Sequence, residues 1–214
     1  MPEAQRRFLI ALVSGALPII AVILASSISV AHQRLPDCQL FIDGCVSISR
    51  AVRQSESVGY FRVLMSIAVI ALFYFWRDWR VPNIAAAAQA RVRWLAYIAL
   101  LALIVYVWTL GTDGRLYTFM RRIGIFVFFG GTLVAQLMTL RLWLQSGIRD
   151  QALTVLKTLT WLIYLLGLAH LAIKLSIDSD AWENRFEWWI GTLLSIWYLA
   201  YARLQWRVDQ RAQL

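Results

Sequence analysis

The sequence has little charge for its length, because only 15% of its 214 residues are Asp, Glu, Lys or Arg. A soluble domain of this size carries about 25% charged residues, whereas 60% of this chain is hydrophobic. This shortage of charge excludes an ordinary soluble domain and favours a protein that lies in a membrane. The apolar runs follow one another with short gaps, so there is no room for a separate soluble domain.

The chain also lacks the short motifs of common soluble enzymes. It contains no G-x-S-x-G nucleophile elbow, no P-loop and no G-x-G-x-x-G turn. Acidic residues are few, 12 against 21 Lys and Arg, and the net charge is +9. The arginines stand mostly at the ends of apolar runs, which is typical of topology control and contact with lipid headgroups. We therefore expect no nucleic-acid partner.

Six apolar runs are long enough to cross a bilayer as helices, which takes about 20 residues each. Helices are expected because lipid cannot satisfy backbone hydrogen bonds, and no run alternates like a barrel strand. The predicted fold class is all-α, a polytopic membrane protein in which residues 1–214 form one six-transmembrane-helix bundle. The predicted spans are about 8–30, 59–76, 94–110, 123–143, 153–175 and 188–204.

The charged residues are divided unevenly between the two sides of this six-span arrangement. The side with both termini holds twelve of the 21 basic residues and four of the 12 acids, a net charge of +8, and the other side has +1. Cytoplasmic loops are enriched in Lys and Arg. We therefore expect a multi-pass protein with both termini in the cytoplasm, in a bacterial inner membrane.

Only two cysteines are present, and both lie in the longest loop, on the side opposite the termini. They are Cys38 and Cys45. A disulfide persists on the oxidising side of a membrane, and we favour one here, where it would staple the outer loop. Two free thiols are the next interpretation. A metal site at this pair is disfavoured because C-x6-C matches no common zinc pattern, and whether the protein holds a metal elsewhere stays open.

Histidine is equally scarce. His32 follows the first span, and His170 lies in the outer third of the fifth. An ionisable residue inside a membrane is a functional hypothesis by default, so these two residues and Ser47 are the candidate catalytic groups, as general base or ligand. In the alternative, His170 hydrogen-bonds across helices and His32 is a solvated loop residue. The sequence implies no particular cofactor, and whether the protein is an enzyme stays open.

Several arginines lie on the side where few are expected. Arg62 lies at the outer start of the second span, and Arg121 and Arg122 precede the fourth. A guanidinium matches phosphate geometry with two parallel hydrogen bonds. We therefore predict that these arginines, with Ser49, hold the phosphate or headgroup of a membrane lipid. The alternative is contact with ordinary headgroups and nearby acids.

The region from His32 to Arg62 reads HQRLPDCQLFIDGCVSISRAVRQSESVGYFR. It resembles the first outer loop of a eukaryotic group of six-helix membrane proteins: the damage-regulated autophagy modulators, the FGF-receptor-activating protein and the GPI-anchor lipid-remodelling proteins. The shared pattern is a polar loop with His and Cys, a Ser-Ile-Ser step at 47–49, and an aromatic-Arg start of the second helix at 60–62. This resemblance implies a lipid-related role on the non-cytoplasmic side.

Together these observations predict an integral membrane protein that binds or remodels a lipid or lipid-linked substrate at the outer leaflet. The alternative is a non-catalytic membrane scaffold, or an assembly subunit of a larger membrane complex. The expected partners are membrane lipids and, in the alternative, another membrane protein.

Overall fold

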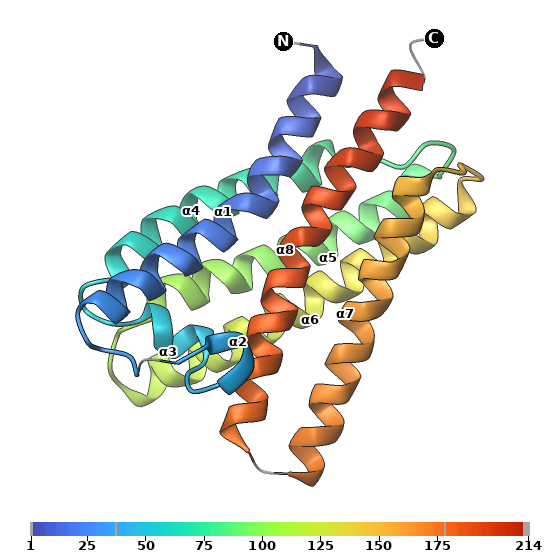
Figure 1. The fold of residues 1–214 in the computed structure, drawn as a ribbon. Helices are drawn as coiled ribbons and strands as arrows, with labels where there is room; N and C mark the ends of the chain where they lie inside the picture. The colour runs from blue at the N-terminus through green and yellow to red at the C-terminus, as the bar shows by residue number, and fades with distance from the viewer. Residues whose placement is uncertain (1, 37, 178, 212–214) are drawn as a thin grey trace.

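A computed structural model describes residues 2–36, 38–177 and 179–211 of the chain. Within these ranges all regular structure is helical, with six long helices, two short ones and no strand (Figure 1). The all-α fold class predicted from the sequence is therefore confirmed. The helices are α1 Glu3–Ala31, α2 Leu40–Asp43, α3 Ile48–Val52, α4 Val58–Asp78, α5 Ala86–Thr109, α6 Arg115–Gln145, α7 Gln151–Ser176 and α8 Asp180–Arg211.

Five of the long helices are long and apolar enough to cross a membrane, and they correspond to the first five predicted spans. They are α1, α4, α5, α6 and α7. The sixth predicted span, 188–204, lies within α8, which is not among the five. α8 contains many Trp and Tyr residues, whose polar ring atoms make it less apolar than a helix of aliphatic residues.

Each long helix packs against the helices that precede and follow it around the bundle. α1 contacts α4 and α8, α5 lies between α4 and α6, and α7 contacts α6 and α8. Neighbours in sequence are therefore neighbours in space, as is usual for short connections. The contact between α8 and α1 closes the ring and brings the start of α1 and the end of α8 to the same end of the bundle (Figure 1).

α1 and α8 pack closely along the halves that carry the chain termini, which we call the closed end. At Gly15, an added Cβ would lie 2.7 Å from the Ser195 carbonyl oxygen and 2.7 Å from Leu199 Cδ2. No larger residue fits this crossing without a shift of one backbone. Nearer the termini, the rings of Phe8 and Trp206 lie 5.4 Å apart between centroids.

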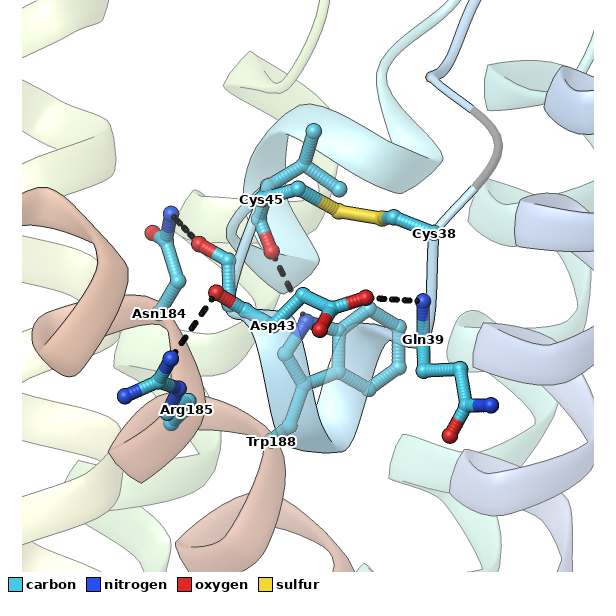
Figure 2. The surroundings of a disulfide bond; sticks show 9 residues. Cys38, Gln39, Asp43, Cys45, Asn184, Arg185 and Trp188 are labelled. Carbon is cyan, nitrogen blue, oxygen red and sulfur yellow. Dashed lines mark hydrogen bonds between the residues drawn. A yellow bond between two sulfur atoms is a disulfide. The ribbon is translucent and has the colours of Figure 1, made fainter.

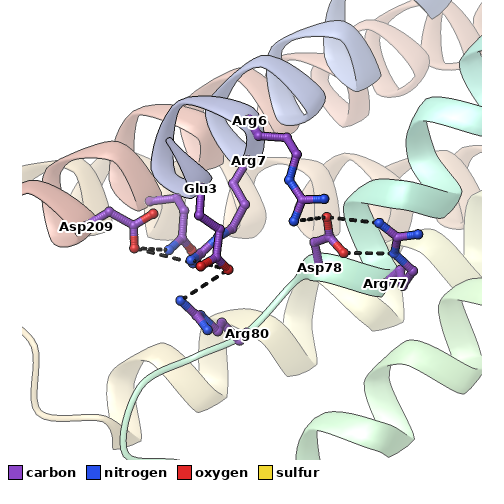
Figure 3. Close-up of polar contacts among 8 residues, drawn as sticks. Glu3, Arg6, Arg7, Arg77, Asp78, Arg80 and Asp209 are labelled. Carbon is purple, nitrogen blue, oxygen red and sulfur yellow. Dashed lines mark hydrogen bonds and ion pairs between the residues drawn. The ribbon is translucent and has the colours of Figure 1, made fainter. Parts of the chain in front are cut away.

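Charged side chains hold the same closed end together (Figure 3). Arg7 is only 8% exposed, and its guanidinium lies 2.8 Å from Glu3 and 3.4 Å from Asp209. Arg6 lies 3.2 Å from Asp78 at the end of α4. These ion pairs connect the start of α1 to both α4 and α8.

The opposite halves of α1 and α8 diverge, and residues 38–57, which we call the capping segment, lie between them (Figure 1). Its α3 packs on α1, where Ser29 Oγ donates to the Ala51 carbonyl oxygen at 2.7 Å. Its α2 packs on α8, where Trp188 Nε1 donates to the Val46 carbonyl oxygen at 2.9 Å. The two helices are therefore joined at this end through the capping segment.

Candidate functional site

The diverging halves of α1 and α8 enclose, together with α4, α5 and α6, a cavity of about 160 Å³ beside the capping segment. Along α8 its lining runs from Glu187 to Tyr198, which is roughly 16 Å at a rise of 1.5 Å per residue. The cavity is thus elongated along the bundle. Its wall is mostly apolar, with lining side chains that include Val22, Phe61, Met65, Leu103, Ile125, Phe128, Phe129 and Leu194.

The wall of this cavity reaches the outer surface of the bundle at two apolar side chains. Ile23 of α1 is 59% exposed and Phe41 of α2 is 42% exposed, and both line the cavity. The Phe41 ring also packs on Trp188, with 5.4 Å between the centroids. An opening between α1 and α2 therefore has apolar side chains on both edges.

Polar groups gather where the cavity meets the capping segment. Glu187 and Tyr106 both line the cavity. The backbone N–H of Ser49 donates to Glu187 Oε1 at 3.4 Å, and Ser49 Oγ lies 2.9 Å from the Tyr106 hydroxyl. Among the described residues, no ion pair involves Glu187. A carboxylate that faces an apolar space without a cation is unfavourable, so this end favours a hydrogen-bond donor.

A second polar group on the cavity wall lacks a partner. Ser14 is fully buried, and its hydroxyl makes no hydrogen bond with any residue that the structure describes. It precedes Gly15, where α1 and α8 come together, so it lies at the side of the cavity nearer the closed end. The cavity therefore has a polar region beside the capping segment and, toward the closed end, a buried hydroxyl without a partner among the described residues.

Cys38 and Cys45 form a disulfide that closes the loop carrying α2 (Figure 2). This agrees with the interpretation favoured from the sequence. The loop is fixed to α8 by Asn184 Nδ2, which donates to the Gly44 carbonyl oxygen at 2.7 Å. Gly44 has a φ of +63°, and an added Cβ there would collide with the Ala181 carbonyl oxygen. Glycine is therefore required at this turn for both its conformation and its small size.

Two of the predicted phosphate-binding arginines lie together at the end of α5. Arg62 Nη2 donates to the carbonyl oxygen of Leu110 and lies 3.5 Å from Thr112 Oγ1. Arg121 Nη1 donates to the carbonyl oxygens of Thr109 at 3.3 Å and Thr112 at 2.6 Å. Carbonyls at a helix end lack partners within the helix, so both guanidiniums cap α5. Neither arginine lines the cavity.

The remaining polar candidates occupy separate places. Arg122 is exposed on α6. Ser47 is the N-cap of α3, and its hydroxyl accepts a hydrogen bond from the Arg50 N–H at 3.1 Å. Among the predicted residues, Ser49 hydrogen-bonds to two groups that line the cavity, Glu187 and Tyr106. Its role as a headgroup ligand stays a prediction.

The two histidines do not meet. His32 is exposed and follows the last turn of α1, while His170 of α7 is partly buried and stacks on Phe186 with 5.5 Å between centroids. α1 and α7 pack on different sides of α8, and their corresponding ends lie apart (Figure 1). Within the described ranges, no group of three or more His, Cys, Asp and Glu side chains is placed to hold a metal. The catalytic roles of His32, His170 and Ser47 stay predictions, and the structure does not assemble them into one site.

Ion pairs outside the apolar spans keep one carboxylate ionised at each end of the bundle. Arg34 Nε donates to Glu56 Oε1 at 3.1 Å, and this pairing lowers the pKa of Glu56 to about 2. At the other end, burial raises the pKa of Asp150, but hydrogen bonds from the Ala152 N–H at 2.7 Å and from Arg207 at 3.1 Å outweigh it. The net shift of the Asp150 pKa is downward, so both carboxylates are ionised at neutral pH.

Sequence reasoning missed Glu187, Tyr106 and Ser14 as members of a common site. The available signal for Glu187 was its position, because it is the acid directly before the apolar run 188–204. Tyr106 and Ser14 give no comparable signal, since hydroxyl side chains in membrane helices commonly bond to neighbouring helices.

Comparison of the chain with protein-family models, with curated proteins and with solved structures finds no match. The resemblance of residues 32–62 to the group of six-helix membrane proteins therefore stays a prediction. The function is inferred from the cavity and from the polar groups that line it.

Proposed function

We propose that this protein is a six-span inner-membrane protein that binds the apolar chain of a lipid or lipid-linked molecule in the cavity between α1 and α8. In this arrangement α8 is the sixth span, both termini lie in the cytoplasm, and the capping segment lies at the outer leaflet. The observation that carries the proposal is an apolar cavity of about 160 Å³ whose wall reaches the bundle surface at Ile23 and Phe41.

Charge and redox chemistry support this orientation, and the length of α8 supports its assignment as the sixth span. The closed end holds arginines paired with Glu3, Asp78 and Asp209, and an excess of arginine is typical of the cytoplasmic face. The capping segment holds the Cys38–Cys45 disulfide, which persists in the oxidising space outside an inner membrane. α8 has 32 residues, more than the roughly 20 that cross a bilayer.

The size and lining of the cavity support an alkyl chain as its occupant. Apolar cavities of about 150 Å³ bind molecules such as benzene, so this cavity is large enough for a segment of an alkyl chain. The surface of α1 beside the opening is apolar, with Ile20 50% exposed and Ile23 59% exposed. A lipid tail can therefore reach the opening from the bilayer without crossing polar surface, and van der Waals packing of its methylene groups against the cavity wall favours binding.

Photo-crosslinking tests the proposal. The protein is placed in nanodiscs with a lipid that carries a diazirine in its chain, and the labelled peptides are quantified by mass spectrometry. Thr192 lines the cavity, and Thr192→Phe places an aromatic ring in it. The ring fills space that the chain would occupy, and forcing both into the cavity costs about 1–3 kcal/mol, so labelling of residues 187–198 should fall about tenfold or more.

Thr158→Phe is the matched control, because Thr158 is exposed on α7 and away from the cavity. Labelling in this variant should equal that of the unmodified protein. Labelling that is unchanged in both variants would mean that the cavity is not the lipid site and would favour the scaffold alternative. Such a scaffold should instead lose a co-purifying membrane partner when exposed residues of the capping segment are changed.

A further inference from the structure

The polar region of the cavity points to the head group of its ligand. We propose that the cavity selects a single-chain lipid with a primary ammonium head, for which the Glu187 carboxylate is the counter-ion. This inference rests on the proposed function and adds a head-group class to it. It assigns no ligand role to Arg62 and Arg121, whose guanidiniums cap α5.

The charge of the site argues for a cation. Glu187 lines an apolar cavity, and within residues 2–36, 38–177 and 179–211 it forms no ion pair. The hydrogen bond that it accepts from the Ser49 N–H is long, at 3.4 Å. A carboxylate in such surroundings is stabilised by a cation that enters with the ligand. An anionic phosphate or carboxylate head would meet the carboxylate with a charge of the same sign.

The arrangement of acceptors argues for an ammonium group in particular. An ammonium has three N–H donors and no acceptor. The carboxylate of Glu187, the hydroxyl of Ser49 and the hydroxyl of Tyr106 come from three different helices and are connected by hydrogen bonds of 3.4 Å and 2.9 Å. Ser49 and Tyr106 share one hydrogen between them, so each oxygen retains acceptor capacity. Glu187 and Tyr106 line the cavity, so the two carboxylate oxygens and the Tyr106 hydroxyl offer three acceptors for three donors.

The shape of the cavity argues for one chain. The lining along α8 spans roughly 16 Å from Glu187 to Tyr198, in a volume of about 160 Å³. A long, narrow and apolar space suits a single alkyl chain that extends from the carboxylate toward the closed end. Ser14, fully buried and without a partner among the described residues, lies along this path.

Competition against photo-labelling tests the head group. The protein is placed in nanodiscs of uncharged lipid, and dodecylamine, dodecanol and dodecyl phosphate are compared as competitors. Because a charge-assisted hydrogen bond is about twice as strong as a neutral one, the amine should halve labelling at a concentration about tenfold lower than the alcohol. The phosphate should be the weakest competitor.

Variants connect this preference to the carboxylate. The alcohol concentration that halves labelling, divided by the amine concentration that does so, should be about ten in the unmodified protein. Glu187→Gln should reduce this ratio to near one. Glu183→Gln is the matched control, because Glu183 lies one turn earlier on α8, pairs with Lys174 at 2.8 Å and does not line the cavity. It should leave the ratio unchanged. Tyr106→Phe removes one acceptor and keeps the ring, and it should raise the amine concentration required by about threefold.

Gel filtration and the melting temperature establish that each variant is folded, and Tyr106→Phe provides a second measurement should Glu187→Gln not fold. Equal competition by amine and alcohol in the unmodified protein would overturn the head-group assignment and leave the cavity as a lipid site. An amine preference that survives in Glu187→Gln would overturn it as well. Absence of competition by all three probes would overturn both the head-group assignment and the proposed function.

Discussion

The two ends of the α1–α8 pair are held together in different ways. At the closed end the helices touch directly, through Gly15 against Ser195 and through the ion pair of Arg7 with Asp209. At the other end they diverge, and the capping segment contacts each of them separately. The cavity lies where direct contact ends.

This difference shows that a cavity in a helix bundle can result from helix divergence as well as from small side chains. α1 is apolar along both halves, and it exposes aliphatic residues on its surface throughout, for example Leu12 and Ile23. The change from contact to divergence follows from what stands between α1 and α8. A glycine allows contact at one end, and a 20-residue segment with its own disulfide separates the helices at the other.

The largest expected effect is the loss of the buried charge of Arg7 at the closed end. Arg7→Met removes a cation that is 8% exposed and leaves Asp209 without it. Loss of one partner of a buried pair costs about 3 kcal/mol, and we expect a destabilisation of about that size in unfolding by denaturing detergent. Arg6→Met is the control, because Arg6 is 43% exposed and exposed pairs contribute less than about 1 kcal/mol. Equal effects of the two variants would contradict a special role for Arg7.

The end of the bundle that holds the capping segment, which we call the capped end, should depend on its disulfide for stability. Replacing both Cys38 and Cys45 by Ser opens a short loop, and the chain-entropy model gives a loss of about 2 kcal/mol. The same loss should follow when the unmodified protein is reduced, measured as a shift in the unfolding midpoint with and without reductant. The double variant should not respond to reductant. A full response in that variant would show that reductant acts elsewhere.

Direct contact at the closed end can be tested with a single methyl group. Gly15→Ala places a Cβ 2.7 Å from the Ser195 carbonyl oxygen, and such overpacking costs about 1–2 kcal/mol. Gly130→Ala is the matched control, because nothing lies within 4 Å of its added Cβ. It should be neutral or stabilising by up to about 1 kcal/mol, since alanine favours helix. A neutral Gly15→Ala would mean that the helices readily separate at this crossing.

The smallest effect concerns pH at the capped end. Pairing with Arg34 lowers the pKa of Glu56 to about 2, so the folded protein binds this proton less tightly than the unfolded chain. The stabilisation is present above the ordinary pKa of 4.5 and is lost as the pH falls through about 2. The difference in melting temperature between the unmodified protein and Glu56→Gln should therefore shrink from pH 5 to pH 2. A constant difference would show that the ion pair does not stabilise the fold.

The helices could be predicted from the sequence, while the site could be predicted only in part. A run of about 20 apolar residues is enough to predict a membrane helix, and five helices of the described chain are long and apolar enough to cross a membrane. The sixth predicted span is not confirmed, because it lies in α8, where Trp and Tyr interrupt the aliphatic pattern. The disulfide was favoured over free thiols because of the expected compartment, and the structure places Cys38 and Cys45 together.

The candidate site residues show why the rest was out of reach. Position along a span predicts how deep a side chain lies, but not which way it faces around the bundle. Arg62 and Arg121 were both placed at the outer ends of their spans, and they meet because α4 and α6 both pack on α5. His32 and His170 were also placed toward the outer ends of their spans, yet their helices, α1 and α7, are not neighbours.

The sequence by itself determined the helical class and the uneven distribution of charge, and it was enough to predict a multi-pass membrane protein. Each of these follows from local composition and from the cost of leaving backbone groups unpaired in lipid. Only the tertiary structure decided that α8 returns to α1, that the two helices separate beyond Gly15, and that Glu187, Ser49 and Tyr106 meet there. These contacts join residues up to 202 positions apart, and they depend on how whole helices pack rather than on any local pattern.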